Sequence, residues 1–228
     1  SEQFLLRNYD YLWLKAMLHK ARTDVTPNAT LITGSSHALN GIQESLWENA
    51  VNCSMHSQDL YYDLLCAREA LRDGRQFSRC IIIMGYYIAF QDLSRSMMLR
   101  KGVISHVYLP IFQDARHWNE PETTSPWDGL PPQPPAVRAA CEHAALQKIL
   151  SYSTYYSPVR PRGTFFDFHG RAWHELPNEE KLHFGKIRAD SHNKSFRYTE
   201  SLHENQACLQ EYIHLLHEHG STPIVVIP

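Results

Sequence analysis

The stretch Leu31–Ile42, LITGSSHALNGI, begins as a short apolar run and changes character at Gly34. A few apolar residues that end at a glycine are typical of a buried strand. Apolar residues then recur at helical spacing from His37 to Trp47, which predicts a helix. The stretch therefore predicts a strand, a turn of small residues and a helix, which together form the repeating unit of an α/β fold.

The same alternation continues along the chain. Three further apolar runs predict strands at residues 50–53, 79–85 and 222–228, and a fourth, residues 102–112, predicts a strand or an extended segment. Helical periodicity predicts helices at residues 8–22, 57–74 with Ser57 as N-cap, 92–99, 136–152 and 195–219. Short uninterrupted apolar strands between helices are typical of a parallel sheet that is covered on both faces. We therefore expect a three-layer α/β/α sandwich, flavodoxin-like, with a mainly parallel sheet of about five strands.

The length and layout of the chain predict one domain, residues 1–228. Segment 113–135 holds six prolines and two tryptophans and is expected to be a long loop insertion. The chain ends on a predicted strand. In open α/β sheets the site lies outside the carboxyl ends of the strands, so a loop after Pro228 would lie beside it. This pattern suggests that the chain is a portion of a longer protein.

Composition excludes several classes of function. The formal net charge of −2 argues against general attraction to nucleic acid or to acidic membranes, and the absence of any 18-residue apolar run argues against a membrane span. Neither GxGxxG nor GxxxxGK[ST] occurs, so no nucleotide cofactor is expected. Five widely spaced cysteines without a CxxC motif, and an N-terminus without a signal pattern, favour a cytoplasmic location.

The Gly34–His37 turn has two interpretations. Ser36 would lie at a helix N-terminus, where backbone N–H groups and the helix dipole stabilise an alkoxide or an oxyanion, so the position suits a nucleophile. Alternatively, Gly-Ser-Ser is an ordinary strand-to-helix turn with serine as the N-cap. The turn alone leaves both interpretations open.

Three blocks of the chain together resemble a known superfamily. LITGSSHALNGI, VNCSMHSQDLYYDLL (51–65) and CIIIMGYYIAFQDLS (80–94) resemble the first blocks of the SGNH (GDSL) hydrolase-like superfamily. The branch is the one that contains the teichoic-acid D-alanylation protein and proteins of capsule or surface-polysaccharide clusters. The resemblance implies the three-layer sandwich, Ser36 as the nucleophile and oxyanion-hole donors from Asn52–Met55. It also places a third donor at residues 85–88.

The chain departs from the superfamily pattern in two places. Tyr87 stands where the superfamily has an asparagine. The Asp-x-x-His block that supplies the base follows the last strand in the superfamily, so the resemblance places the base beyond Pro228. One Asp-x-x-His occurs inside the chain, at Asp114 and His117, and these two residues are the internal candidates. The pairs Asp167/His169 and Asp190/His192 fall in segments predicted to be irregular.

The residues expected to bind the oxyanion or the substrate surround the turn. They are Gly34, Ser35, His37, Asn52, Ser54, Tyr86 and Tyr87. Tyr86 and Tyr87 follow a strand end, where an aromatic ring could stack on a sugar. His214, His217 and His219 have a spacing compatible with a metal pair, but no HExxH motif or cysteine pair supports one, so no metal is expected.

Together these features predict a serine-dependent acyl-ester hydrolase or O-acyltransferase that acts on a cell-surface polysaccharide or another glycan, with the tryptophan-bearing loop as a lid. The alternative is a non-catalytic SGNH-like module that binds glycan or assembles with polysaccharide-biosynthesis enzymes. The resemblance favours the cell surface, whereas the cysteines and the N-terminus favour the cytoplasm.

Overall fold

The computed structural model describes residues 9–26, 28–42, 46–47, 49–95, 103–117, 132, 134–151 and 173–228. Most of the predicted loop 113–135 lies outside these residues, as do Asp167 and His169. Among the described helices, none combines the length and apolar character needed to cross a bilayer. All five cysteines are free thiols, and four of them are buried.

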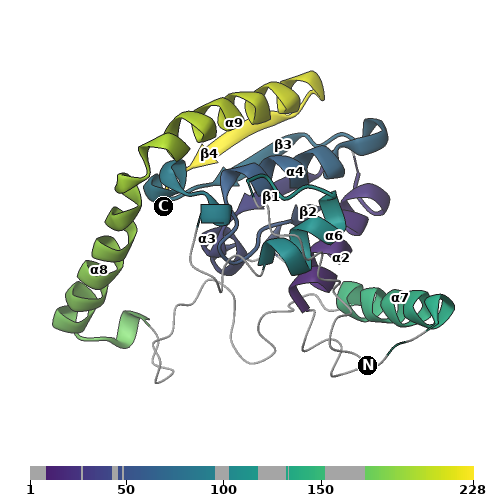
Figure 1. The fold of residues 1–228 in the computed structure, drawn as a ribbon, viewed down its shortest axis with the longest axis horizontal. Coiled ribbons are helices and arrows are strands. Elements are labelled where there is room, and N and C mark those ends of the chain that lie inside the picture. The colour runs from purple at the N-terminus through teal and green to yellow at the C-terminus, as the bar shows by residue number, and fades with distance from the viewer. Residues whose placement is uncertain are drawn as a thin grey trace.

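The centre of the fold is a sheet of four parallel strands in the order β2-β1-β3-β4 (Figure 1). The strands are β1 (Thr30–Gly34), β2 (Ala50–Asn52), β3 (Arg79–Ile83) and β4 (Thr222–Val226). Gly34 pairs with Ile83, and Ile83 pairs with Val226. The carboxyl ends of β1, β3 and β4 therefore meet at one edge of the sheet, which confirms the predicted α/β class.

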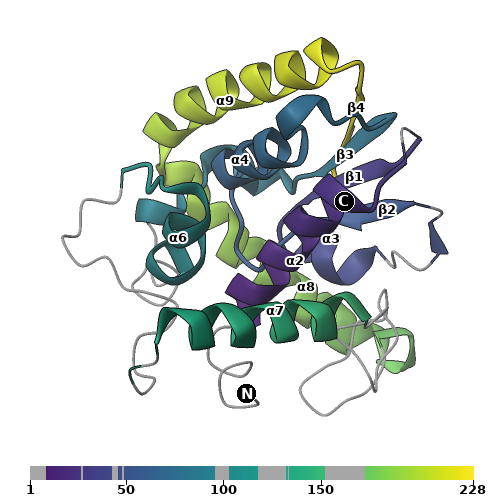
Figure 2. The same cartoon turned by 90° about the vertical axis from the view of Figure 1, so that its right-hand side faces the viewer.

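Alternating side chains along the strands form two cores. Leu31, Val51, Cys80 and Ile82 belong to the larger core, together with residues of α2 (Tyr9–Thr23), α4 (Leu60–Ala70) and α9 (Thr199–Glu218). Figure 2 shows these three helices on one side of the sheet. Ile32, Ala50, Ile81 and Ile83 form a smaller cluster with Ala38 of α3 (Ser36–Gly41). Both faces of β1, β2 and β3 are therefore covered, as their apolar sequences predict, whereas the apolar edge strand β4 is largely exposed at Ile224, Val225 and Val226.

Among the described residues the sheet has four strands rather than the expected five, because residues 103–112 of the predicted strand are helical. Ile104–Tyr108 is a π-helical segment, η5, which continues into α6 (Leu109–Phe112). Its β-branched residues suggested a strand, but the side chains at 104, 105, 107 and 108 are buried, which is a helical spacing. Tyr108 stacks on Tyr62 of α4 with ring centroids 3.8 Å apart, and this packing favours the helix.

Several predicted helices differ from the observed ones in their ends or their type. Helix α4 is capped by Asp59 rather than Ser57: the Asp59 carboxylate accepts the Tyr62 N–H at 3.2 Å. Ser57 has a φ of 60°, whereas an N-cap residue adopts an extended backbone. Helix α3 ends at Gly41, earlier than predicted, because Ile42 is extended. Leu93–Arg95, within the predicted helix 92–99, is a 3-10 turn.

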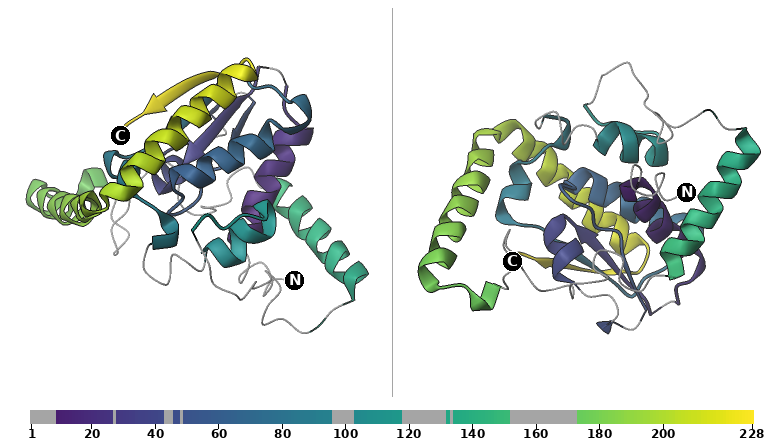
Figure 3. Two further views of the ribbon diagram at one scale, coloured as in Figure 1. Left: turned by 45° about the horizontal axis from the view of Figure 1, so that its top comes forward. Right: turned by 90° about the horizontal axis from the view of Figure 1, so that it is seen from below.

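The remaining helices lie at the periphery. Helix α7 (Pro135–Ser151) forms as predicted and packs on α2, where Glu142 accepts hydrogen bonds from Lys15 (2.5 Å) and Tyr11 (2.7 Å). Helix α8 (Asn178–Asn193) projects from the opposite side of the molecule (Figure 3). It includes Asp190 and His192, so the prediction of an irregular segment there is wrong. Helix α8 buries none of its residues, so it carries no apolar stripe for a sequence pattern to show.

Candidate functional site

The turn at Gly34 is fixed by backbone geometry. Gly34 has a φ of 142°, and a Cβ built there would lie 2.4 Å from the Ile83 carbonyl oxygen of the neighbouring strand. Only glycine fits a position with both constraints. Ser35 follows as the extended N-cap residue of α3, and its carbonyl accepts the N–H groups of Ala38 and Leu39. The strand therefore passes into the helix within two residues, as predicted.

The two serines of the turn differ in exposure. Ser35 is 4% exposed, whereas Ser36 is half-buried as the first residue of α3. The Ser35 side chain makes no capping hydrogen bond. N–H groups in the first turn of a helix have no intrahelical acceptor. Ser36 is therefore the serine that a substrate could reach, next to backbone donors.

His37 connects the turn to the segment after β3. Its Nδ1 lies 3.4 Å from Ser35 Oγ and 3.2 Å from the Tyr87 hydroxyl. Tyr87 belongs to η3 (Tyr86–Phe90), which follows the carboxyl end of β3. Burial and the nearby charge of Arg188 lower the pKa of His37, so its imidazole is neutral at pH 7. A neutral imidazole that carries its proton on Nε2 can accept a hydrogen bond at Nδ1 from either hydroxyl.

Helix α8 adds a second histidine to this group. The His192 ring stacks on Tyr87 with centroids 3.7 Å apart and lies edge-on to His37 at 6.2 Å. Tyr86 donates a hydrogen bond to Asn193 Oδ1 at 3.1 Å. The structure thus brings residues 192 and 193 to the serine turn from a distant part of the sequence. We refer to Ser35, Ser36, His37, Tyr87 and His192 as the serine-turn cluster.

The predicted oxyanion segment, Asn52–Met55, lies beside the turn, but its N–H groups are already bonded. The N–H of Cys53 donates to Ile32 O (2.9 Å), that of Ser54 to Asn52 Oδ1 (3.0 Å) and that of Met55 to Gly34 O (3.3 Å). The Asn52 side-chain amide donates to Ala38 O at 3.3 Å. The Ser54 hydroxyl is buried and has no hydrogen-bond partner among the described residues. In this conformation the segment holds the turn in place and presents no free backbone donor at residues 53–55.

A buried carboxyl supports the turn from α4. Asp63 accepts the backbone N–H of Gly34 and, at 2.6 Å, the side-chain amide of Gln58. Burial raises the pKa of Asp63 to about 8, although both hydrogen bonds lower it. The carboxyl is therefore mostly protonated at pH 7, and a neutral acid avoids the cost of a buried charge.

In the structure Asp114 and His117 each bind a different partner. Asp114 accepts the Tyr61 hydroxyl at 2.6 Å. His117 Nδ1 lies 2.9 Å from Asp92 Oδ2, and His117 Nε2 lies 3.8 Å from Glu204 Oε1. Asp92, not Asp114, is therefore the carboxylate that orients this histidine.

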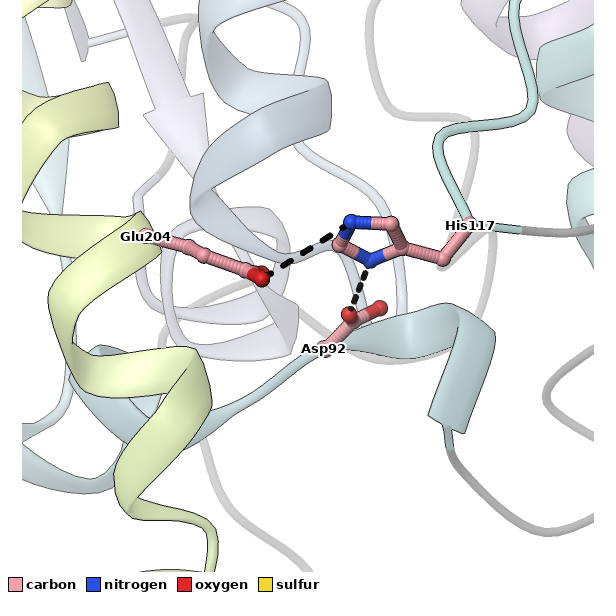
Figure 4. Close-up of side chains that lie close together, drawn as sticks. All are labelled: Asp92, His117 and Glu204. Carbon is pink, nitrogen blue, oxygen red and sulfur yellow. Dashed lines mark hydrogen bonds and ion pairs between the residues drawn. The ribbon is translucent and has the colours of Figure 1, made fainter.

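Asp92, His117 and Glu204 are the described residues that could hold a metal ion, because one ligand atom from each lies within 4.8 Å of the others. Figure 4 shows the His117 ring between the two carboxylates. The same carboxylates pair with Arg95, whose Nε lies 3.3 Å from Asp92 Oδ2 and whose Nη2 lies 3.3 Å from Glu204 Oε1. Arg116 pairs with Glu204 at 3.4 Å. A cation would compete with these guanidinium groups, so the cluster is best described as an ion-pair network.

Comparison of the chain with protein-family models, with curated proteins and with solved structures finds no match.

Proposed function

We propose that the protein is a serine-dependent acyl-ester hydrolase or O-acyltransferase that acts on a cell-surface polysaccharide or another glycan. The observation that carries this proposal is the position of Ser36. It is half-buried at the start of α3, on a glycine-dependent turn at the carboxyl edge of a parallel sheet, and the two histidines of the serine-turn cluster lie near the same turn. Ligands of open α/β sheets bind at this edge, and a serine nucleophile needs a nearby base.

In the proposed reaction, Ser36 Oγ attacks the carbonyl carbon of an ester and its proton passes to a histidine. The N–H groups at the start of α3 stabilise the oxyanion of the tetrahedral intermediate. The intermediate collapses to an acyl-serine as the histidine returns the proton to the leaving alcohol. Water then releases the acyl group in a hydrolase, or a sugar hydroxyl accepts it in a transferase.

The serine-turn cluster offers two histidines for the base, His37 and His192. His37 Nδ1 contacts Ser35 and Tyr87, and adjacent side chains on a turn generally diverge, so His37 is poorly placed for Ser36 itself. His192 contacts the same tyrosine ring from helix α8. His37 and His192 are therefore added to the Asp114/His117 pair as candidates inside the chain.

Exposed aromatic rings beside the cluster support a sugar-containing substrate. Tyr86 is 44% exposed and Phe196 is 43% exposed, and their ring centroids lie 5.8 Å apart. Aromatic rings with one free face pack against apolar faces of ligands. Polysaccharide-biosynthesis enzymes as partners and a cytoplasmic location, with the cell surface as the alternative, also stay proposals.

The second candidate is a non-catalytic glycan-binding or assembly module. The occupied N–H groups of residues 53–55 favour it, because the segment expected to complete an oxyanion hole has none of these donors to offer. Tyr87, at the position of the superfamily's asparagine, removes a further amide donor.

Esterase assays on p-nitrophenyl acetate and on an O-acetylated polysaccharide test the proposal. We expect Ser36→Ala to reduce kcat/KM by about 1,000-fold or more. Replacing the histidine that serves as base, in His37→Ala or His192→Ala, should cost about 100-fold or more. Ser191→Ala, at an exposed serine of α8, is the matched control and should retain activity. Polysaccharide binding without any Ser36-dependent turnover would favour the binding module instead.

A further inference from the structure

A basic cavity lies at the amino edge of the sheet, opposite the serine turn. It has a volume of about 460 Å³. One wall is the end of α2, and the other is the segment from η2 (Arg72–Gly74) to Arg75. The lining residues are His19, Arg22, Thr23, Arg72, Asp73, Gly74 and Arg75. These two segments lead into the first residues of β1 and β3, whereas the serine turn follows the last residues of β1.

The charges in this cavity are unbalanced and partly fixed in place. Glu69 Oε1 accepts a hydrogen bond from Arg22 at 2.6 Å, and the exposed Arg72 guanidinium lies 3.5 Å from the same oxygen, so the two guanidinium groups lie close together. Arg75 forms no ion pair with any described residue. Three arginines against Glu69 and Asp73 leave a local charge of 3 − 2 = +1, while the whole chain carries −2.

We infer that this cavity binds the phosphate group of a phosphorylated small molecule. Arginine presents donors in a planar fork that matches phosphate oxygens, and Arg22, already held by Glu69, loses less side-chain entropy when an anion binds. The lining has no large apolar side chain, so the cavity does not suit an apolar ligand. Its volume leaves room for more than the phosphate itself, which favours a phosphate ester over free phosphate.

This binding site is independent of the proposed esterase. It lies at the other end of the strands and shares no residue with the serine-turn cluster. A ligand there would be held without contact to Ser36. Binding can therefore be measured whether or not the protein has esterase activity.

Isothermal titration calorimetry at low ionic strength, with inorganic phosphate and with glycerol 3-phosphate as probes, tests this inference. The test variant is Arg72→Gln/Arg75→Gln, which removes two guanidinium groups at exposed positions. The control is Arg68→Gln, at an exposed arginine of α4 that pairs with Glu211 outside the cavity. We expect the double variant to raise the Kd by about 10-fold or more and the control to leave it within about 2-fold. Circular dichroism verifies that each variant is folded.

Tighter binding of glycerol 3-phosphate than of phosphate would assign the site to phosphate esters. Equal affinities would assign it to free phosphate and overturn the preference for an ester. Absence of binding to the wild-type protein would overturn the inference as a whole. An equal loss of affinity in the Arg68→Gln control would also overturn it, because the binding would then reflect general surface charge.

Discussion

Gly34→Ala should destabilise the protein more than the same replacement at any other glycine that the structure describes. The new Cβ would lie 2.4 Å from the Ile83 carbonyl oxygen and 3.0 Å from the Ala38 Cβ. Both neighbours are packed: Ile83 pairs with Gly34 in the sheet, and Ala38 is fully buried. Neither can move without separating β1 from β3 or displacing α3.

The magnitude follows from two contributions. A non-glycine residue held at a φ of 142° costs about 1–3 kcal/mol. Forcing a methyl group into a packed region costs about 1–3 kcal/mol more. We therefore expect Gly34→Ala to lower the free energy of unfolding by about 2–6 kcal/mol. A loss of this size is a large part of the free energy of unfolding of a typical domain.

Two other glycines separate these contributions. At Gly74 a Cβ would meet nothing within 4 Å, but φ is 75°, so alanine should cost only about 1–2 kcal/mol. At Gly41 the space is also open and φ is not positive, so alanine should be neutral or slightly stabilising. Urea denaturation followed by tryptophan fluorescence measures all three variants. A Gly34→Ala protein within about 1 kcal/mol of the wild type, or no less stable than Gly74→Ala, would refute the reasoning.

Three further predictions concern buried polar groups. The pKa of Asp63 is raised to about 8 from 3.8, so the folded state keeps a proton that the unfolded state releases. Between about pH 4 and pH 8 the free energy of unfolding should therefore fall by up to about 1.4 kcal/mol per pH unit from this group, and urea titrations of Asp63→Asn across that range should lack this decline. Arg116→Met should lower the free energy of unfolding by about 3–5 kcal/mol in the same assay, because it leaves the buried Asp59 carboxyl, 3.5 Å away, without its cationic partner. A loss below about 1 kcal/mol would argue against a charged Asp59. Tyr212→Phe removes the hydroxyl that lies 2.9 Å from the buried Thr33 hydroxyl and should lower the thermal midpoint by an amount corresponding to about 1–3 kcal/mol; an unchanged midpoint would mean that this hydrogen bond adds no net stability.

The strands and the serine turn could be predicted because their signals are local. β1 and β3 are uninterrupted apolar runs, and buried parallel strands need no alternation of polar and apolar residues. β4 has the same apolar sequence, although most of its side chains are exposed at the edge of the sheet. A glycine followed by two serines marks the end of β1 directly. The approach of Tyr87 to that turn also follows, because the carboxyl ends of adjacent parallel strands meet at one edge.

Two features depend on tertiary contacts that local patterns do not show. Residues 104–108 have the composition of a strand, but stacking of Tyr108 on Tyr62 favours a helical segment. Helix α8 lacks an apolar stripe, so neither its existence nor the arrival of His192 at the serine turn could be predicted from periodicity.

The pairing of Asp92 with His117 shows a different limit of sequence reasoning. The Asp-x-x-His spacing pointed to Asp114, whereas the fold presents a carboxylate from 25 residues upstream at 2.9 Å. A spacing motif can identify the histidine, but it cannot say which carboxylate folds against it.

The most direct test of the proposed function is the intact mass of the protein after reaction with a fluorophosphonate, which forms a covalent bond with an activated serine. The proposal predicts a single adduct on the wild-type protein and on Ser35→Ala, and none on Ser36→Ala. A wild-type protein that forms no adduct, or an adduct that persists in Ser36→Ala, would contradict Ser36 as the nucleophile.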